Sequence, residues 1–123
     1  MKSLYVIVHE HYIRDQLDVL RARNGELGRI PSILDEITRI KKEERWVEVA
    51  GTENPFTVRY PLDGVKSALV CGAYGEMSVR DHGKALQNRG VSVEYHDAGI
   101  LFARRDLLMD LPRVDMCSIE FYE

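Results

Sequence analysis

Residues with catalytic or metal-binding side chains follow three apolar segments that have the length of buried strands. In chain order, these groups are His9-Glu10-His11, the turn from Gly72 to Ser78, and His96-Asp97. In open α/β sheets, ligands bind outside the carboxyl ends of the strands. We therefore predict that the three groups lie at one edge of a sheet and form the functional surface.

His9 and His11 have a spacing that is found in metal sites, because alternate residues of an extended backbone share a face. With His82, His96 or Asp97 nearby as a third ligand, they would form a site for zinc or a similar ion. The alternative is that they are hydrogen-bonded polar side chains at a strand end. We favour the alternative, since a metal site needs a convergence that spacing alone does not show. We thus predict that no cofactor is bound. The alternative hypothesis is a metal ion at His9 and His11.

The turn from Gly72 to Ser78 links an apolar segment to a predicted helix. Gly72 and Gly75 would let the backbone turn sharply and approach a ligand closely. Amides at the start of the helix would then hold an anion or a developing oxyanion. The predicted ligand-binding residues are Gly72, Tyr74, Gly75, Glu76, His11, His82, His96 and Asp97.

Ser78 has two interpretations. With Asp81 it matches a capping box, so its ordinary role would be to cap the helix that follows. Alternatively Ser78 is a nucleophile, which needs an adjacent base. His9 could supply that base, with Glu10 or Asp97 to orient the imidazole.

The elements that must position these residues alternate along the chain. Apolar or β-branched runs predict strands at residues 4–8, 46–49, 67–71, 91–95 and 116–122, and weak alternation indicates an edge strand at 56–60. Helical spacing, breakers and prolines predict helices at residues 12–23, 31–45, 76–89 and 107–111.

The helix after Pro31 carries the clearest helical pattern. Ser32 and Asp35 form a capping box at its start, and Lys41 and Lys42 complement the dipole at its end. Its apolar stripe consists of Ile30, Ile33, Leu34, Ile37 and Ile40.

Strands that alternate with helices predict an α/β fold built from right-handed βαβ units. We expect a three-layer α/β/α, Rossmann-like arrangement with a mostly parallel sheet of about five strands. The length of 123 residues suits one domain over residues 1–123.

Composition narrows the classes of function. The formal net charge is −3, which argues against non-specific electrostatic binding to nucleic acid or to an anionic membrane. The apolar run that ends at His9 is too short for a signal peptide, and none approaches the roughly 20 residues of a membrane span. Cys71 and Cys117 each lie in an apolar run and are predicted to be buried, reduced thiols. We expect a cytoplasmic protein.

The region around the turn resembles the isochorismatase-like cysteine hydrolases. The similarity lies in residues 68–79, in Ala85-Leu86 and Arg89-Gly90-Val91, and in the segment from Val93 to His96-Asp97-Ala98. Those proteins have an apolar strand, a glycine, a short turn, Cys-Val, a helix, Arg-Gly, and a strand that ends in Asp-Ala. The first strand fits the family's opening strand more weakly.

The departures from the family fall on its catalytic residues. The family's nucleophilic cysteine corresponds to Ser78, and its aspartate base corresponds to His9 or a neighbour. Its catalytic lysine has no counterpart between Trp46 and Tyr60, and the chain is shorter than typical members. The resemblance therefore implies the family's scaffold without its thiol chemistry.

Three functions remain at this stage. The first is a non-catalytic domain that binds a small polar or anionic ligand, or a protein partner, at the turn from Gly72 to Ser78. The second is a hydrolase that uses Ser78 with His9, and the third is a metal-dependent enzyme that uses His9 and His11. We rank them in that order, and the resemblance also implies a homo-oligomer.

Overall fold

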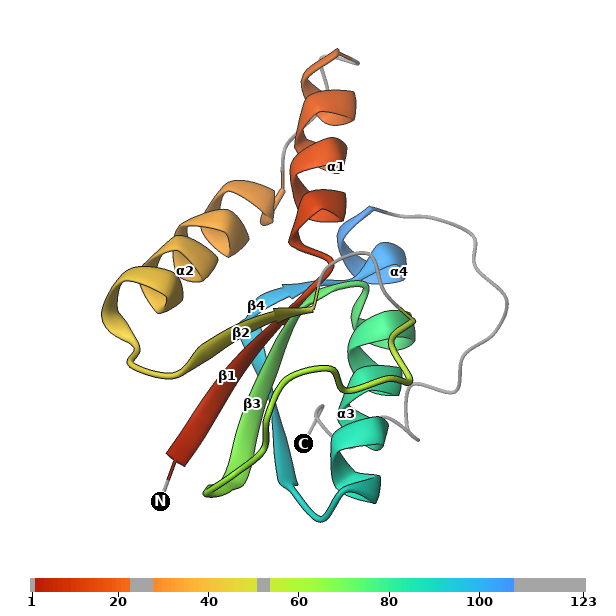
Figure 1. The fold of residues 1–123 in the computed structure, drawn as a ribbon. Helices are drawn as coiled ribbons and strands as arrows, with labels where there is room; N and C mark the ends of the chain where they lie inside the picture. Colours follow the sequence, from red (N-terminus) through yellow and green to blue (C-terminus); the bar gives the residue numbers. More distant parts are fainter. Residues whose placement is uncertain (1, 23–27, 51–53, 108–123) are drawn as a thin grey trace.

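The computed structural model of the chain describes residues 2–22, 28–50 and 54–107 (Figure 1). Strands and helices alternate over this part of the chain. The strands are β1 (Lys2–Val8), β2 (Val47–Ala50), β3 (Val65–Ala73) and β4 (Ser92–Leu101). The helices are α1 (Glu10–Ala22), α2 (Ile30–Glu43), α3 (Arg80–Asn88) and α4 (Ala103–Asp106), and a π-helical turn (Gly75–Val79) leads into α3.

The described strands form one parallel sheet in the order β2-β1-β3-β4. The prediction of an α/β fold with a parallel sheet is confirmed, with four strands in the described part where about five were expected. The predicted strand at 116–122 lies outside the described residues. The predicted edge strand at 56–60 is wrong, because these residues form a loop. Prolines at both ends of the segment, Pro55 and Pro61, disfavour a continuous strand.

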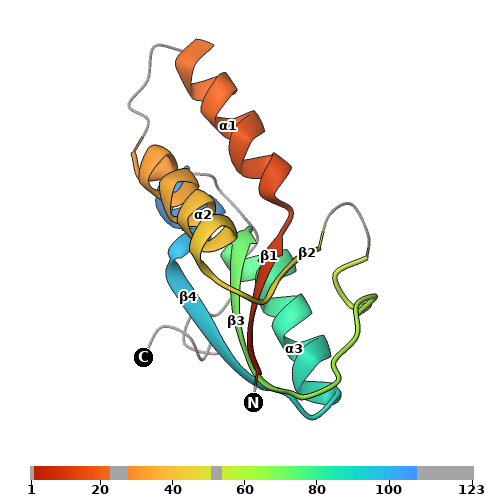
Figure 2. The ribbon, with the colours of Figure 1, turned by 60° about the vertical axis from the view of Figure 1, so that its left-hand side comes forward.

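Helices cover both faces of the sheet, and Figures 1 and 2 show α2 and α3 on opposite sides of it. Neighbouring residues of β4 confirm this placement, because successive side chains of a strand point to opposite faces. The Tyr95 hydroxyl lies 3.4 Å from the Arg80 carbonyl oxygen of α3, whereas His96 contacts Glu36 of α2.

The core lies between the sheet and the helices on its two faces. Val6, Ile7 and Val8 have no exposed surface, as expected for a central strand. The predicted stripe of α2 is confirmed: four of its isoleucines are fully buried, namely Ile30, Ile33, Ile37 and Ile40. Burying one side chain of this size contributes about 1.5–3 kcal/mol.

The predicted capping box of α2 is wrong. Arg29 occupies the N-cap position and makes no side-chain capping bond. The Ser32 hydroxyl instead donates a hydrogen bond of 2.9 Å to the Arg29 carbonyl oxygen. At the end of α3, by contrast, Gly90 has φ +85°, as expected for a residue that ends a helix.

Strand β4 is longer than its sequence pattern predicts. Val70 pairs with Tyr95 and Gly72 with Ile100, so the two-residue step on β3 corresponds to five residues on β4. This bulge absorbs His96-Asp97, which therefore lie inside β4 and not at its end, as was predicted. The short helix also comes earlier than expected, at 103–106, and residues 108–111 lie outside the described part.

Over the described ranges, none of the helices combines the length and the apolar character needed to cross a membrane.

Candidate functional site

The two glycines of the predicted turn are needed for packing within the protein. Gly72 lies inside β3 with φ +113°, and a Cβ on it would lie 2.6 Å from the Val8 nitrogen and still closer to the Val8 oxygen. A Cβ on Gly75 would lie 2.7 Å from Cγ2 of Ile100 and would also overlap the Phe102 ring. Both glycines are buried. The two glycines therefore allow a close approach to other segments of the protein, where the sequence had indicated a close approach to a ligand.

Glu76 is fully buried, and its carboxylate is occupied by the start of α4. One carboxylate oxygen accepts a 2.8 Å hydrogen bond from the Ala103 amide, and the other accepts a 3.3 Å bond from the Arg104 amide. Glu76 thus fixes α4 against the π-helical turn, and we assign it no role in ligand binding.

Ser78 lies within the π-helical turn and is half-buried. The N-cap positions on either side of it are Tyr74 and Val79, and neither start has a side-chain capping bond, so the predicted capping role is wrong. Asp81, its expected partner in the capping box, pairs with Arg80 at 3.3 Å. Among the described residues, no hydrogen bond joins Ser78 to a histidine.

His82 is buried in α3 and holds the loop that follows β2. Its Nδ1 lies 2.8 Å from the Pro55 carbonyl oxygen, and its Nε2 lies 2.5 Å from the Tyr60 hydroxyl. Because a carbonyl oxygen only accepts, Nδ1 carries the hydrogen and the hydroxyl donates to Nε2. Burial lowers the pKa of His82, opposed by the Pro55 carbonyl and reinforced by nearby His9.

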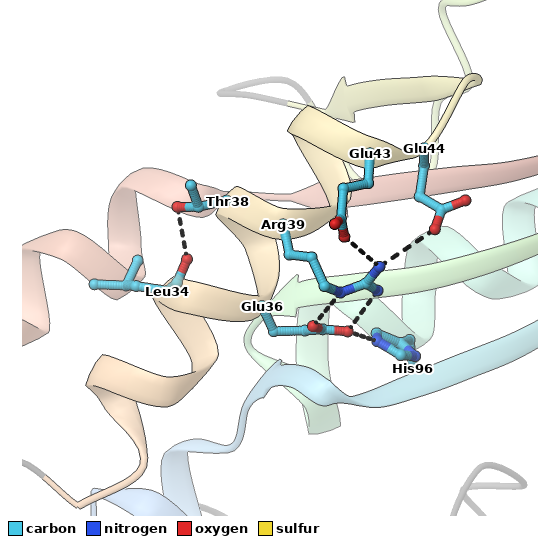
Figure 3. Close-up of polar contacts among 7 residues, drawn as sticks. All are labelled: Leu34, Glu36, Thr38, Arg39, Glu43, Glu44 and His96. Carbon is cyan, nitrogen blue, oxygen red and sulfur yellow. Dashed lines mark hydrogen bonds and ion pairs between the residues drawn. The ribbon is translucent and has the colours of Figure 1, made fainter.

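His96 belongs to an ionic network between β4 and α2, shown in Figure 3. Its Nε2 contacts Glu36, which also makes a 2.7 Å pair with Arg39. Arg39 reaches Glu43 at 3.2 Å and Glu44 at 3.3 Å. Bonds from Arg39, and then from His96, outweigh desolvation and lower the pKa of Glu36 to about 2. His96 thus points to the α2 face, away from α3.

Asp97, the neighbour of His96, is half-exposed and paired. Its carboxylate lies 3.0 Å from Arg105 and 3.5 Å from Arg29. Arg29 also donates a 2.9 Å bond to the Ile100 carbonyl oxygen and pairs with Asp106 at 3.4 Å. The network connects the start of α2, the bulge of β4 and α4. Asp97 therefore joins these elements through its ion pairs with the two arginines.

The structure does bring together rings at the ends of β1 and β3. His9, between β1 and α1, has φ +49°, which turns the chain into the helix. The ring centroids of His9 and His11 lie 4.7 Å and 4.2 Å from that of Tyr12, and the Tyr12 ring stacks at 5.8 Å on Tyr74. Gln16 donates a 3.1 Å bond to the Tyr74 hydroxyl. We call His9, His11, Tyr12 and Tyr74 the aromatic cluster.

The sequence indicated three members of the aromatic cluster and missed Tyr12, together with its neighbour Gln16. Tyr12 and Gln16 are four positions apart, so they share one face of α1. That spacing could have indicated that Tyr12 and Gln16 act together. It does not show which strand end this face of α1 contacts. His9 is buried, whereas His11, Tyr12 and Tyr74 are half-buried and keep some contact with solvent.

A hollow of about 200 Å³ lies between the end of β2 and the loop at 54–60. Ala50 lines it, and the Ala50 carbonyl oxygen accepts a 2.8 Å bond from the His9 amide, so the hollow adjoins the end of β1. A shallower hollow of about 420 Å³ lies along α2. Its two arginines, Arg29 and Arg39, are those of the ionic networks described above.

The described residues contain no group of three His, Cys, Asp or Glu side chains arranged to hold a metal ion. His9 and His11 are adjacent, with ring centroids 5.7 Å apart. A protein zinc site takes three or four ligands, so this pair would need further ligands.

Cys71 is a free thiol, buried in β3. Burial, together with the charges of Glu36 and Glu10, raises the pKa of this thiol to about 12. Cys117, the other cysteine, lies outside the described residues.

We expect Cys71 to be unreactive. In a Cys117→Ser variant, a thiol reagent such as DTNB should react with the folded protein on the order of 100-fold more slowly than with the urea-unfolded chain, because the thiolate is the reactive form. Similar rates in the two states would show that Cys71 is accessible and ionisable.

The chain was compared with models of protein families, with curated proteins and with solved structures, and none of them matches it.

Proposed function

We propose that this chain is an isochorismatase-like α/β domain that binds a small polar or anionic ligand at the aromatic cluster and lacks thiol chemistry. The observation that carries the proposal is the gathering of His9, His11, Tyr12 and Tyr74 where β1 and β3 end. That position is where open α/β sheets bind ligands.

The chemistry of the aromatic cluster suits such a ligand. Imidazole N–H groups and the tyrosine hydroxyl can donate hydrogen bonds, and the rings offer apolar faces to a planar group. Glu10, which lies between the two histidines in sequence, pairs with Arg14 at 2.9 Å and with Lys41 of α2. Its charge is thereby compensated, which favours an anion over a cation as the ligand.

The surroundings of Ser78 favour a domain that binds a ligand without catalysis over a hydrolase. A serine is a weak nucleophile without an adjacent base. The described residues provide no hydrogen bond from Ser78 to His9, and the imidazole of His96 is engaged by Glu36 on the α2 face. Cys71, the cysteine closest in sequence to this turn, is buried and largely protonated.

Titration with benzoate and with inorganic phosphate tests the proposal. We expect saturable shifts in the NMR signals of His11 and Tyr74 with at least one probe. Loss of a hydrogen bond to a charged ligand costs about 1.5–3 kcal/mol, so His11→Ala and Tyr74→Ala should each weaken that binding by roughly tenfold or more. Phe56→Ala, at a residue that is 65% exposed outside the aromatic cluster, is the control and should leave affinity unchanged.

Two results would argue against the proposal. One is that neither probe perturbs the aromatic cluster. The other is turnover of p-nitrophenyl acetate that Ser78→Ala abolishes, since this would favour the hydrolase that uses Ser78 with His9.

A further inference from the structure

Residues 54–64, which we call the latch loop, are the described residues between β2 and β3, and His82 fixes them to α3. Pro55 and Tyr60, near the start and the middle of the loop, each contact one nitrogen of the same imidazole. His82 is 1% exposed, whereas Asn54, Phe56, Thr57 and Arg59 of the loop are exposed. A buried side chain on the helix therefore provides polar contacts that hold the loop, in addition to the packing of Val58, Tyr60 and Leu62 against the core.

The two contacts require a neutral imidazole with its hydrogen on Nδ1. Nδ1 donates to the Pro55 carbonyl oxygen, which leaves the Nε2 lone pair to accept from the Tyr60 hydroxyl. Protonation would place a hydrogen on Nε2 as well, so the hydroxyl would have to turn and become an acceptor. It would also leave a positive charge buried, and an unpaired buried charge is strongly disfavoured.

The charged and titratable groups around His82 do not offset that charge. From the end of β1, His9 disfavours protonation of His82. On its own helix, the neighbouring Arg80 and Asp81 pair with each other. From β2, Glu48 acts on Tyr60 of the latch loop, where burial first and then this charge raise the pKa of the hydroxyl.

From β4, Tyr95 approaches the same helix, and its hydroxyl bonds the Arg80 carbonyl oxygen. A hydroxyl that donates to a carbonyl oxygen carries its hydrogen and supplies no negative charge. A protonated His82 therefore gains most by reaching water, and both groups that hydrogen-bond its ring belong to the latch loop.

We propose that His82 is an acid-released latch: below about pH 6.5, its protonation frees the latch loop from α3 while the sheet stays folded. The hollow beside β2 is lined by Asn54, Thr57 and Tyr60, so release changes the wall of that hollow and the surroundings of His9. The proposal does not rest on ligand binding at the aromatic cluster.

The sign and size of the effect follow from proton linkage. We call the state with both His82 contacts the closed state, and the state in which the latch loop has left α3 the open state. In the closed state the pKa of His82 is lowered, and in the open state it returns to about 6.5. The closed state is thus fully favoured above pH 6.5 and is weakened as the pH falls. Between pH 7.5 and pH 5, opening should become more favourable by at most about 30-fold, the limit set by a pKa of about 6.5 in the open state.

Amide hydrogen exchange measures this directly as protection factors, which are corrected for the intrinsic effect of pH. The Thr57 amide donates to Asn54 at 3.0 Å within the latch loop, and the Tyr5 amide donates to Trp46 at 3.0 Å within the sheet. From pH 7.5 to pH 5, the protection of Thr57 should fall severalfold, and by at most about 30-fold. The protection of Tyr5 should stay within about twofold.

Two variants and one spectrum complete the test. In His82→Gln, which cannot titrate, the protection of Thr57 should be the same at both pH values. In Tyr60→Phe, it should already be lower at pH 7.5, because the hydroxyl bond is lost. NMR of the imidazole nitrogens at pH 7.5 should show hydrogen on Nδ1 of His82.

The proposal is overturned if Thr57 keeps its protection at pH 5, if Tyr5 loses protection in parallel, or if His82 carries its hydrogen on Nε2 at pH 7.5. Should His82→Gln fail to fold, the comparison of Thr57 with Tyr5 in the unaltered chain still decides the matter. An equal loss of Thr57 protection in a folded His82→Gln variant would also exclude the latch.

Discussion

Gly72→Ala is expected to lower the free energy of unfolding by about 3–6 kcal/mol. The new Cβ would lie 2.6 Å from the backbone nitrogen of Val8 and 2.7 Å from its carbonyl carbon, so the overlap is with backbone and no rotamer change relieves it. The φ of +113° adds strain, because residues other than glycine rarely adopt this backbone conformation. A loss of this size is a large fraction of the total stability of a small domain.

Gly90→Ala separates the two causes, since Gly90 has φ +85° and a Cβ there would meet no atom within 4 Å. We expect it to cost about 1–2 kcal/mol from backbone strain alone. Urea denaturation of both variants measures the difference. Equal losses would show that β1 and β3 do not approach each other as closely at Gly72 as the structure has them.

Glu76→Ala is expected to lower the free energy of unfolding by about 3–5 kcal/mol. The substitution removes the acceptor of two backbone amides, those of Ala103 and Arg104, and leaves a buried cavity. Glu76→Gln keeps the size of the side chain and one acceptor oxygen, so a smaller loss of about 1–2 kcal/mol should follow.

Glu94 provides the matched control, because it is an exposed glutamate on β4. Glu94→Ala should change the free energy of unfolding by no more than about 0.5 kcal/mol. Thermal or urea denaturation of the three variants measures the series, and hydrogen exchange of the Ala103 amide reports on α4 itself. If Glu76→Ala matched Glu94→Ala, the carboxylate would not hold α4 as we describe.

The elements with strong local patterns were predictable from the sequence. Residues 4–8 are all apolar, as a strand covered on both faces must be, and the isoleucines of α2 recur at helical spacing. Gly90 ends α3 because a positive φ suits glycine. Each of these features depends on neighbours in sequence, which is why a single chain reveals it.

The features that depend on distant residues were not predictable. The bulge of β4 looks like a strand end in the sequence, since Asp97-Ala98-Gly99 resembles a turn, and only pairing with β3 carries the strand on to Leu101. The interpretation of Ser78 as a cap failed because the chain forms a π-helical turn at that position.

The same limit applies to the candidate site. His9, His11 and Tyr74 could be selected because they follow apolar segments, and their rings do gather through Tyr12. His96 was selected by the same reasoning, and His82 by its place one turn into the following helix, but His82 holds a loop and His96 contacts Glu36 of α2. Residue type and position at a strand end do not show the direction in which a side chain points, which the partners across the fold decide.

A crystal structure of the protein soaked with benzoate and phosphate tests the central claim most directly. The account predicts density for at least one of these probes against His11 and Tyr74, at the ends of β1 and β3. Density for a probe only along α2 or beside β2, or none at all at concentrations that saturate binding in solution, would contradict it.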